Sequence, residues 1–166
     1  VNEKMAAGTE SGGVVVWDCR NLANSTQPFA RYDVHTEAVS VVKFGIQFGS
    51  STDPCPESEE PTARTLLTGS VDHLVCQIDP TQTEEEDAVL NVLNTEAPVA
   101  SLDFYHDWAV GTLAWVLSTT DIVTIWDYEK AECVCKHDNL LRHTEADYLA
   151  ENETGAKSSL PIDYVA

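Results

Sequence analysis

Three stretches of this chain share one form: a β-rich run, a tight turn and a second β-rich run that ends in Trp-Asp or a variant of it. They extend over residues 4–18, 65–79 and 114–127. The turns between the runs are formed by Gly12-Gly13, by Val71-Asp72-His73 and by Thr120-Asp121. Such residues allow a sharp reversal, and the flanking runs are rich in β-branched side chains. The pattern therefore predicts three antiparallel hairpins.

The spacing of the hairpins indicates a repeat. Their last Asp residues are Asp18, Asp79 and Asp127, which gives spacings of 61 and 48 residues. An acidic, Pro-containing insertion at residues 49–62 lengthens the first spacing. Without this insertion both spacings approach the period of about 40 to 45 residues that is typical of four-stranded repeat units.

Between the hairpins, further apolar runs complete each unit. An outer strand is expected at residues 29–33, 89–93 and 133–136, and a strand that leads the next unit at residues 39–44, 99–104 and 161–165. Four strands per unit form a propeller blade. The sequence thus predicts an all-β fold with about twelve strands, or three blades, and no helices of the kind that a parallel α/β sheet requires.

The chain resembles the WD-repeat (WD40) family, and within it the WD repeat-containing protein eighty-nine group. The resemblance is carried by Ala6-Ala7-Gly8-Thr9-Glu10 before Trp17-Asp18, by His35-Thr36, by Thr68-Gly69-Ser70 with Asp72, by Glu85-Glu86-Asp87-Ala88 and by Trp126-Asp127. It implies a WD40 β-propeller segment, part of a ring of about seven blades, that serves as a protein-binding scaffold without catalytic activity. It also implies that Trp17, Asp18, Trp126 and Asp127 pack within blades.

In this family a loop His, a strand Ser or Thr, a turn Asp and the Trp of Trp-Asp form a hydrogen-bonded network. The resemblance assigns His35, Ser70 and Asp72 to that network in the middle repeat. Ile78 stands where the Trp belongs, so only part of the network is expected there. The first repeat has no turn Asp, and Asp121 in the third lies one residue closer to its Trp-Asp.

The repeats divide the chain into parts. We expect an incomplete blade at 1–34, a blade at 35–95 that carries the acidic insertion 49–62, a blade at 96–137, an irregular connection at 138–160 and the first strand of a further blade at 161–166. A single blade cannot bury both of its faces. The uncovered faces are expected to pack on blades of a longer propeller, or on a second copy in a head-to-tail ring.

The net charge of the chain limits the classes of partner that it can bind. The sequence contains nine Lys and Arg and 28 Asp and Glu, so its net charge is −19. A charge of this sign repels the phosphate backbone of nucleic acid. One acidic group comprises Asp53, Glu57, Glu59 and Glu60, and a second comprises Glu84, Glu85, Glu86 and Asp87. Both are candidate docking sites for a partner protein with basic segments. The alternative is that these are solvated loops and that the chain is a purely structural module, completing a propeller ring or a homo-oligomer.

Tyr105 and Trp108 follow a predicted strand and are further candidates for partner binding, because Trp and Tyr are favoured in interface cores. Ser70, His35 and Asp72 do not require a catalytic explanation, since the repeat network accounts for them. No Gly-x-Ser-x-Gly or His-Glu-x-x-His pattern occurs in the sequence. We therefore predict no enzyme, no catalytic residue, no metal and no cofactor.

The five cysteines include no Cys-x-x-Cys pair, which favours reduced thiols. We interpret Cys133 and Cys135 as small buried side chains rather than as half of a metal site. No apolar run is long enough to span a membrane, and the first ten residues lack the pattern of a signal peptide. An intracellular location, cytoplasmic or nuclear, is expected.

Overall fold

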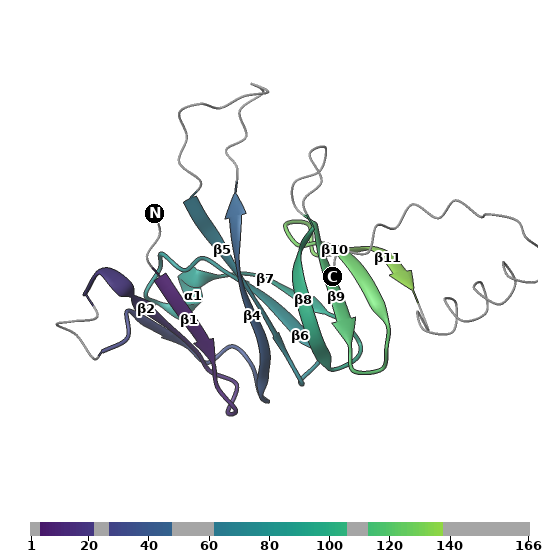
Figure 1. The fold of residues 1–166 in the computed structure, drawn as a ribbon, viewed down its shortest axis with the longest axis horizontal. Helices are drawn as coiled ribbons and strands as arrows, with labels where there is room; N and C mark the ends of the chain where they lie inside the picture. Colours follow the sequence, from purple (N-terminus) through teal and green to yellow (C-terminus); the bar gives the residue numbers. More distant parts are fainter. Residues whose placement is uncertain (1–3, 22–26, 48–61, 106–112, 138–166) are drawn as a thin grey trace, which may run out of the picture.

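The computed structural model describes residues 4–21, 27–47, 62–105 and 113–137. Eleven strands in this part of the chain form three antiparallel sheets that stand side by side (Figure 1). The expected segments 138–160 and 161–166, most of the acidic insertion and Trp108 lie outside the described residues. One helix of a single turn and one short 3₁₀ turn accompany the strands, and no helix in the described part is long and apolar enough to cross a membrane.

Sheet A has three strands in the order β1-β2-β3, with β1 at Lys4–Gly8, β2 at Val14–Asp18 and β3 at Ala30–Tyr32. A 3₁₀ turn, Cys19–Asn21, follows β2. The β1–β2 hairpin turns at Gly12, whose φ of 91° is readily adopted by glycine. A Cβ there would lie 2.1 Å from the carbonyl oxygen of His35, so glycine is also required by space.

Sheet B has the order β4-β5-β6-β7. Its strands are β4 at Val39–Gln47, β5 at Thr62–Ser70, β6 at Leu74–Ile78 and β7 at Val89–Asn94. Thr62 was assigned to the insertion from the sequence but is the first residue of β5, where it pairs with Gln47. The single-turn helix α1, Glu85–Ala88, was not predicted. Four residues are too few for the hydrophobic periodicity that identifies a helix in a sequence.

Sheet C has the order β11-β10-β9-β8, with β8 at Val99–Tyr105, β9 at Leu113–Ser118, β10 at Val123–Asp127 and β11 at Glu132–His137. Successive strands are antiparallel in sheets B and C, as four-stranded repeat units require. In register, β1 of sheet A corresponds to β5 and β9, because each pairs with the strand that carries Trp17, Ile78 or Trp126 just before the final Asp of its hairpin. Sheet A therefore lacks a counterpart of β4 and β8 among the described residues.

Two cores join the sheets. We call the face of a sheet that looks toward the next sheet along the chain its front, and the opposite face its back. The first core lies between the front of sheet A, with Val14, Val16 and Tyr32, and the back of sheet B, with Leu66 and Ile78. All five side chains are fully buried. Period-two alternation along each strand separates these residues from their neighbours on the other face.

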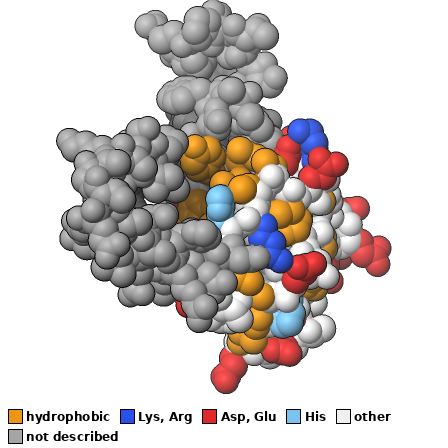
Figure 2. All heavy atoms as spheres, turned by 90° about the vertical axis from the view of Figure 1, so that its right-hand side faces the viewer, with side chains coloured by type: hydrophobic (Ala, Val, Ile, Leu, Met, Phe, Trp, Pro, Cys, Tyr) orange, Lys and Arg blue, Asp and Glu red, His pale blue; other side chains and the backbone are white. Residues whose placement is uncertain are grey.

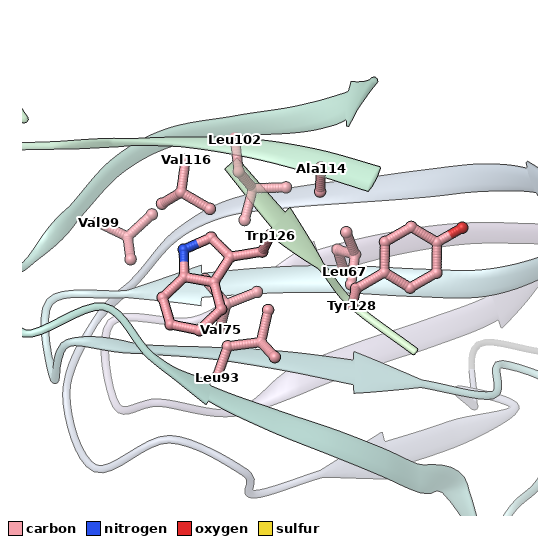
Figure 3. Packing of buried hydrophobic residues seen from close by; sticks show 9 residues of the cluster. All are labelled: Leu67, Val75, Leu93, Val99, Leu102, Ala114, Val116, Trp126 and Tyr128. Atoms are coloured by element: carbon pink, nitrogen blue, oxygen red, sulfur yellow. The ribbon is translucent and has the colours of Figure 1, made fainter. Parts of the chain in front are cut away.

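The second core lies between the front of sheet B and the back of sheet C. Trp126 lies near Val75 and Leu93, and Val116 and Leu102 complete the packing (Figure 3). The indole nitrogen of Trp126 donates a hydrogen bond of 2.8 Å to the Thr124 hydroxyl. The blade-packing role expected for Trp126 thus matches its place in this core.

Close approach of sheets B and C depends on Gly45 in β4. A Cβ at this position would lie 2.4 Å from the ring atom Cζ of Phe104 in β8. The Phe104 ring in turn meets Tyr128 edge to face, with centroids 5.5 Å apart. The absence of a side chain at Gly45 therefore lets an aromatic ring fill the space between the sheets.

Candidate interaction surface

The connections that carry the candidate partner-binding residues leave the sheets at one end. β4, β6 and β8 run in the same direction and finish at Gln47, Ile78 and Tyr105. We call this the upper end, because β4 and β8 finish toward the top of Figure 1. The connections at 48–61, 79–88 and 106–112 all begin there, although only the second is described. The fold thus brings the ends of β4, β6 and β8 to the same end of the three sheets.

The described connection, residues 79–88, is anchored to sheet A by three contacts from separate strands and loops. The Tyr32 hydroxyl donates a 2.6 Å hydrogen bond to the Gln82 carbonyl, and the Lys4 ammonium group donates one to the Pro80 carbonyl. The backbone N–H of Asp33 donates a 2.6 Å hydrogen bond to the Glu85 carboxylate. The loop is therefore held against the neighbouring sheet rather than projecting freely.

Lys4 is central to this anchoring. Its ammonium nitrogen lies 3.5 Å from the centroid of the Phe29 ring, a cation–π contact. Burial lowers the pKa of Lys4, while the nearby carboxylates of Asp18 and Asp79 oppose this shift. The positive charge of Lys4 is thus surrounded by partners within the protein and is not offered to a ligand.

Asp79 stabilises the start of the same connection. Its carboxylate accepts hydrogen bonds from the backbone N–H and the hydroxyl of Thr81, at 2.9 and 2.7 Å. Burial alone would raise the pKa of Asp79, but these bonds, with one from Gln82, lower it below its usual value. The Asp that ends the second repeat therefore shapes the loop that follows it.

The four acidic residues predicted at 84–87 do not all have the same role. Glu85 binds the backbone of sheet A, whereas Glu84, Glu86 and Asp87 are exposed and have no hydrogen bond to their carboxylates within the described structure. Tyr105, another predicted candidate, is 47% exposed where β8 ends at the same upper end. Asp53, Glu57, Glu59, Glu60 and Trp108 lie outside the described residues.

Arg20 and Lys130, two cations near the upper end, are engaged with groups of the protein. Arg20 forms an ion pair with Asp18, and its hydrogen bonds lower the pKa of Asp18 to about 2. Lys130 lies 2.6 Å from the carboxylate of Asp127, which also accepts the Lys130 N–H. The positive charges of Arg20 and Lys130 are therefore balanced by the carboxylates of Asp18 and Asp127.

The predicted network forms at the opposite, lower end, but with one change. His35 Nδ1 lies 3.2 Å from both carboxylate oxygens of Asp72, and His35 Nε2 lies 2.9 Å from the hydroxyl of Thr68. Ser70 does not contact His35; its hydroxyl accepts the Asp72 N–H and donates to the Ala38 carbonyl. Thr68 was missed as a member because the sequence offers two strand hydroxyls, at 68 and 70, two residues apart.

Burial controls the protonation of this network. The His35 side chain is fully buried, and desolvation lowers its pKa although Asp72 opposes the shift. A neutral imidazole fits the geometry: Nδ1–H donates to Asp72, and Nε2 accepts from Thr68. Burial would raise the pKa of Asp72, but hydrogen bonds from the Thr36 and Leu74 N–H groups lower it. The arrangement stiffens a turn and offers no exposed reactive atom.

The predicted Trp and Asp residues of the outer hairpins have different surroundings. Trp126 is in the second core and Asp127 is buried, whereas Trp17 is only partly buried on the back of sheet A.

The described cysteines are free thiols: Cys19, Cys76, Cys133 and Cys135. The prediction that Cys133 and Cys135 are buried is wrong: Cys133 is exposed and Cys135 partly exposed. Among the described residues β11 pairs with β10 alone, at the edge of sheet C, which fits the exposure of these two side chains.

Comparisons with known proteins show the fold. No protein-family model and no curated protein sequence matches the chain. The chain is similar to the computationally designed Ika8 protein, with a TM-score of 0.59 and 16% identity over 83% of this chain and 34% of that one. It is also similar to a chain in the crystal structure of the Mitotic Checkpoint Complex, with a TM-score of 0.58 and 18% identity over 81% of this chain and 37% of that one.

The chain spans about a third of the length of both solved structures. Together with the three antiparallel sheets packed face to face, this likeness identifies the described part as an all-β segment of a β-propeller, with each sheet a blade.

Proposed function

We propose that this chain is a protein-interaction module of the WD-repeat type, most similar to the WD repeat-containing protein eighty-nine group, which binds a basic segment of a partner protein at its upper end. The observation that carries the proposal is the exposure of Glu84, Glu86 and Asp87 in the 79–88 connection, which is held at that end against sheet A. The similarity to a chain of the Mitotic Checkpoint Complex, itself an assembly of proteins, is consistent with such a role.

Electrostatics support a basic partner. The chain carries a net charge of −19, and Lys4, Arg20 and Lys130, which lie near the upper end, are engaged within the protein. An uncompensated set of carboxylates raises the local concentration of a basic segment and its association rate. Exposed Tyr105 would add apolar contact at the same end.

Rigidity also supports a binding role. The Tyr32–Gln82 and Asp33–Glu85 hydrogen bonds hold the 79–88 connection on sheet A, so that its carboxylates keep a fixed spacing. A pre-organised surface loses less conformational entropy on binding than a free loop does.

We propose that the module is not catalytic. The one described His–Asp pair, His35 and Asp72, has a fully buried imidazole whose second nitrogen is occupied by Thr68. A general base must reach the proton that it removes from a substrate, and this imidazole is closed off by the protein itself.

The test uses a synthetic Arg- and Lys-rich peptide with a fluorescent label, and an acidic peptide of the same length as a second probe. We expect the basic peptide to bind and its Kd to rise by at least about tenfold when ionic strength rises from about 0.1 to about 0.5 M, because salt screens exposed charges. The variant Glu84→Gln/Glu86→Gln/Asp87→Asn should weaken binding by about tenfold, a change of about 1.4 kcal/mol.

A matched control removes three exposed acids at the lower end, in Glu10→Gln/Glu37→Gln/Asp121→Asn. Asn is chosen for position 121 because it tolerates the φ of 60° there. This control should change the Kd less than twofold. Equal weakening by both triple variants would assign binding to net charge alone, and no binding of the basic peptide would favour the purely structural role.

A further inference from the structure

The outer edge of sheet B is open within the described structure. Figure 2, which views the molecule from the side of sheet C, shows hydrophobic side chains gathered on the outward face of that sheet, the kind of face on which blades stack. Sheet B differs, because sheets A and C cover both of its faces. Its last strand, β7, pairs with β6 and with no other described strand. The open edge of β7 therefore does not depend on what covers sheets A and C.

The hydrogen bonds next to β7 show which of its backbone groups face outward. The Thr95 N–H donates a 2.9 Å hydrogen bond to the His73 carbonyl, where the ladder between β6 and β7 ends. In an antiparallel pair, hydrogen-bonded residues alternate along each strand with residues whose backbone groups point to the other side. Counted back from Thr95, the N–H and C=O groups of Val92 and Asn94 therefore point away from β6. In the described structure no further strand pairs with them.

β7 lacks the features that commonly keep an edge strand from pairing. Its six residues, Val89–Asn94, include no charged residue and no proline. By contrast, the outer strand β3 carries Arg31 and the outer strand β11 carries Lys136. Charged side chains and proline on an edge discourage the addition of another strand. Leu90 and Val92 are 48% and 49% exposed, so the edge of β7 offers apolar contact as well as hydrogen bonds.

Exposed carboxylates lie at the start of the same strand. β7 begins at Val89, directly after the helix α1, which contains Glu86 and Asp87. Both of these side chains are exposed, as is Glu84 just before the helix. An added strand that carries Lys or Arg at this end would therefore lie beside groups of opposite charge.

Charge favours a partner protein as the occupant of this edge. Residues 48–61 contain four acidic residues and no Lys or Arg, and residues 138–166 contain six acidic and two basic residues. Both segments are thus negatively charged, and a second copy of the chain carries −19. None of the three would complement the carboxylates at the start of β7.

From these observations we propose that an extended segment of the partner protein adds to sheet B as a further strand beside β7. The segment runs antiparallel to β7, as neighbouring strands do throughout sheet B. Its apolar residues contact Leu90 and Val92, and its basic residues, on the C-terminal side, reach the carboxylates at 84–87. The inference rests on the proposed binding of a basic segment and specifies how that segment is held.

The experiment compares three labelled peptides of equal length by fluorescence anisotropy. The strand-basic peptide has alternating Val and Thr followed by Lys and Arg, the basic-strand peptide has the same two parts in the opposite order, and the basic peptide has Gly and Ser in place of Val and Thr. We expect the strand-basic peptide to bind at least about tenfold more tightly than the basic peptide, and to keep this gain at about 0.5 M salt, because salt does not screen strand pairing. The basic-strand peptide should gain less than about twofold, since antiparallel pairing would place its charges at the far end of β7.

Two variants of β7 test the edge itself. Val92→Pro removes an N–H that points away from β6, a position where an edge strand tolerates proline. It should reduce the gain of the strand-basic peptide to less than about twofold and leave the basic peptide unaffected. Leu90→Thr/Val92→Thr removes apolar contact, keeps the charge and strand propensity, and should reduce the gain by at least about threefold. This second variant gives the test if circular dichroism shows that Val92→Pro does not fold.

A matched control changes an exposed apolar residue on another outer strand. Val134→Thr on β11, where the side chain is 60% exposed, should leave the gain of the strand-basic peptide unchanged. Amide hydrogen exchange, measured by NMR, reports the pairing directly. The strand-basic peptide should slow exchange of the Val92 and Asn94 N–H groups, whereas the basic peptide should not.

The outcomes separate this inference from the proposed function. If the basic peptide binds and the strand-basic peptide binds no more tightly, the acidic site is supported and strand addition is wrong. If only the strand-basic peptide binds and exchange slows at Val92 and Asn94, strand addition is supported and the acidic site alone is insufficient. A gain that survives in both β7 variants, an equal gain for the basic-strand peptide, or no binding of any peptide would overturn the antiparallel addition to β7.

Discussion

Trp17 and Trp126 occupy equivalent register positions on the backs of sheets A and C, yet among the described residues a second sheet covers Trp126 and none covers Trp17. Trp126 pairs with Ala114 and is 9% exposed in the second core, whereas Trp17 pairs with Met5 on a face that no described sheet covers. The same residue type in the same local setting therefore has two environments, and the difference arises from what packs against it.

This difference predicts unequal costs of truncation. Trp126→Ala removes a buried ring and should lower the free energy of unfolding by about 3 to 5 kcal/mol. Trp17→Ala removes a partly exposed ring and should cost no more than about 1 kcal/mol. Urea denaturation at a protein concentration low enough to keep the chain monomeric measures both. Equal losses for the two variants would contradict the burial that the structure assigns.

The His35–Asp72 pair predicts loss of stability in acid. The pKa of His35 in the folded protein lies below its ordinary value of 6.5, so the unfolded chain takes up a proton first as the pH falls. The free energy of unfolding is therefore fully retained above about pH 7 and declines below about pH 6.5. The lowered pKa of Asp72 adds a further decline below its ordinary value of 3.8.

The variant His35→Gln should have lower stability at pH 7 and a flatter dependence on pH between about 7 and 5. A matched control is His73→Asn in the adjacent turn, where the side chain is exposed and the φ of 72° suits Asn. Urea midpoints measured at several pH values compare the two variants with the parent. If the pH dependence of stability persisted in His35→Gln but disappeared in His73→Asn, it would arise from His73, and the prediction for His35 would be wrong.

Close packing between sheets B and C predicts an energetic coupling between Gly45 and Phe104. Gly45→Ala would place Cβ 2.4 Å from the ring and should cost about 1 to 3 kcal/mol. Phe104→Leu removes the clashing atoms, so the double variant should lose less stability than the sum of the single losses. Thermal or urea unfolding of the four proteins gives this coupling, and strict additivity would show that the two residues do not compete for space.

Glu85 and Glu86 are neighbours in α1 that should respond differently to the same change. Glu85→Ala removes the acceptor for the Asp33 N–H and should lower the free energy of unfolding by about 1 kcal/mol. Glu86→Ala, at an exposed position of the same helix, should leave stability within about 0.5 kcal/mol. Comparison of their urea midpoints tests whether the 79–88 connection is anchored through Glu85, and identical midpoints would count against that anchoring.

Much of the local structure could be predicted from the sequence. The hairpins at residues 4–18, 65–79 and 114–127 are present because their turn residues and β-branched runs act over only a few positions. Strand ends were less accurate: β5 begins at Thr62, within the predicted insertion. Extension of a strand depends on a partner to pair with, and here β4 supplies it as far as Gln47.

The candidate site was predicted only in part. The resemblance placed His35 and Asp72 together correctly, but the hydroxyl in contact with His35 belongs to Thr68 and not to Ser70. The separate role of Glu85 was not predicted either, since it depends on a backbone N–H 52 positions earlier in the chain. Long-range pairs of this kind are set by how sheets A and B pack.

The sequence by itself determined the repeat, the hairpins and the alternation of side chains between the two faces of each strand, because these follow from backbone geometry over a few residues. Only the tertiary structure decided which of those faces is buried and which connections meet at one end. A strand side chain loses contact with water only when another sheet lies against it, and that depends on residues far away in the chain. Trp17 and Trp126 differ for that reason alone.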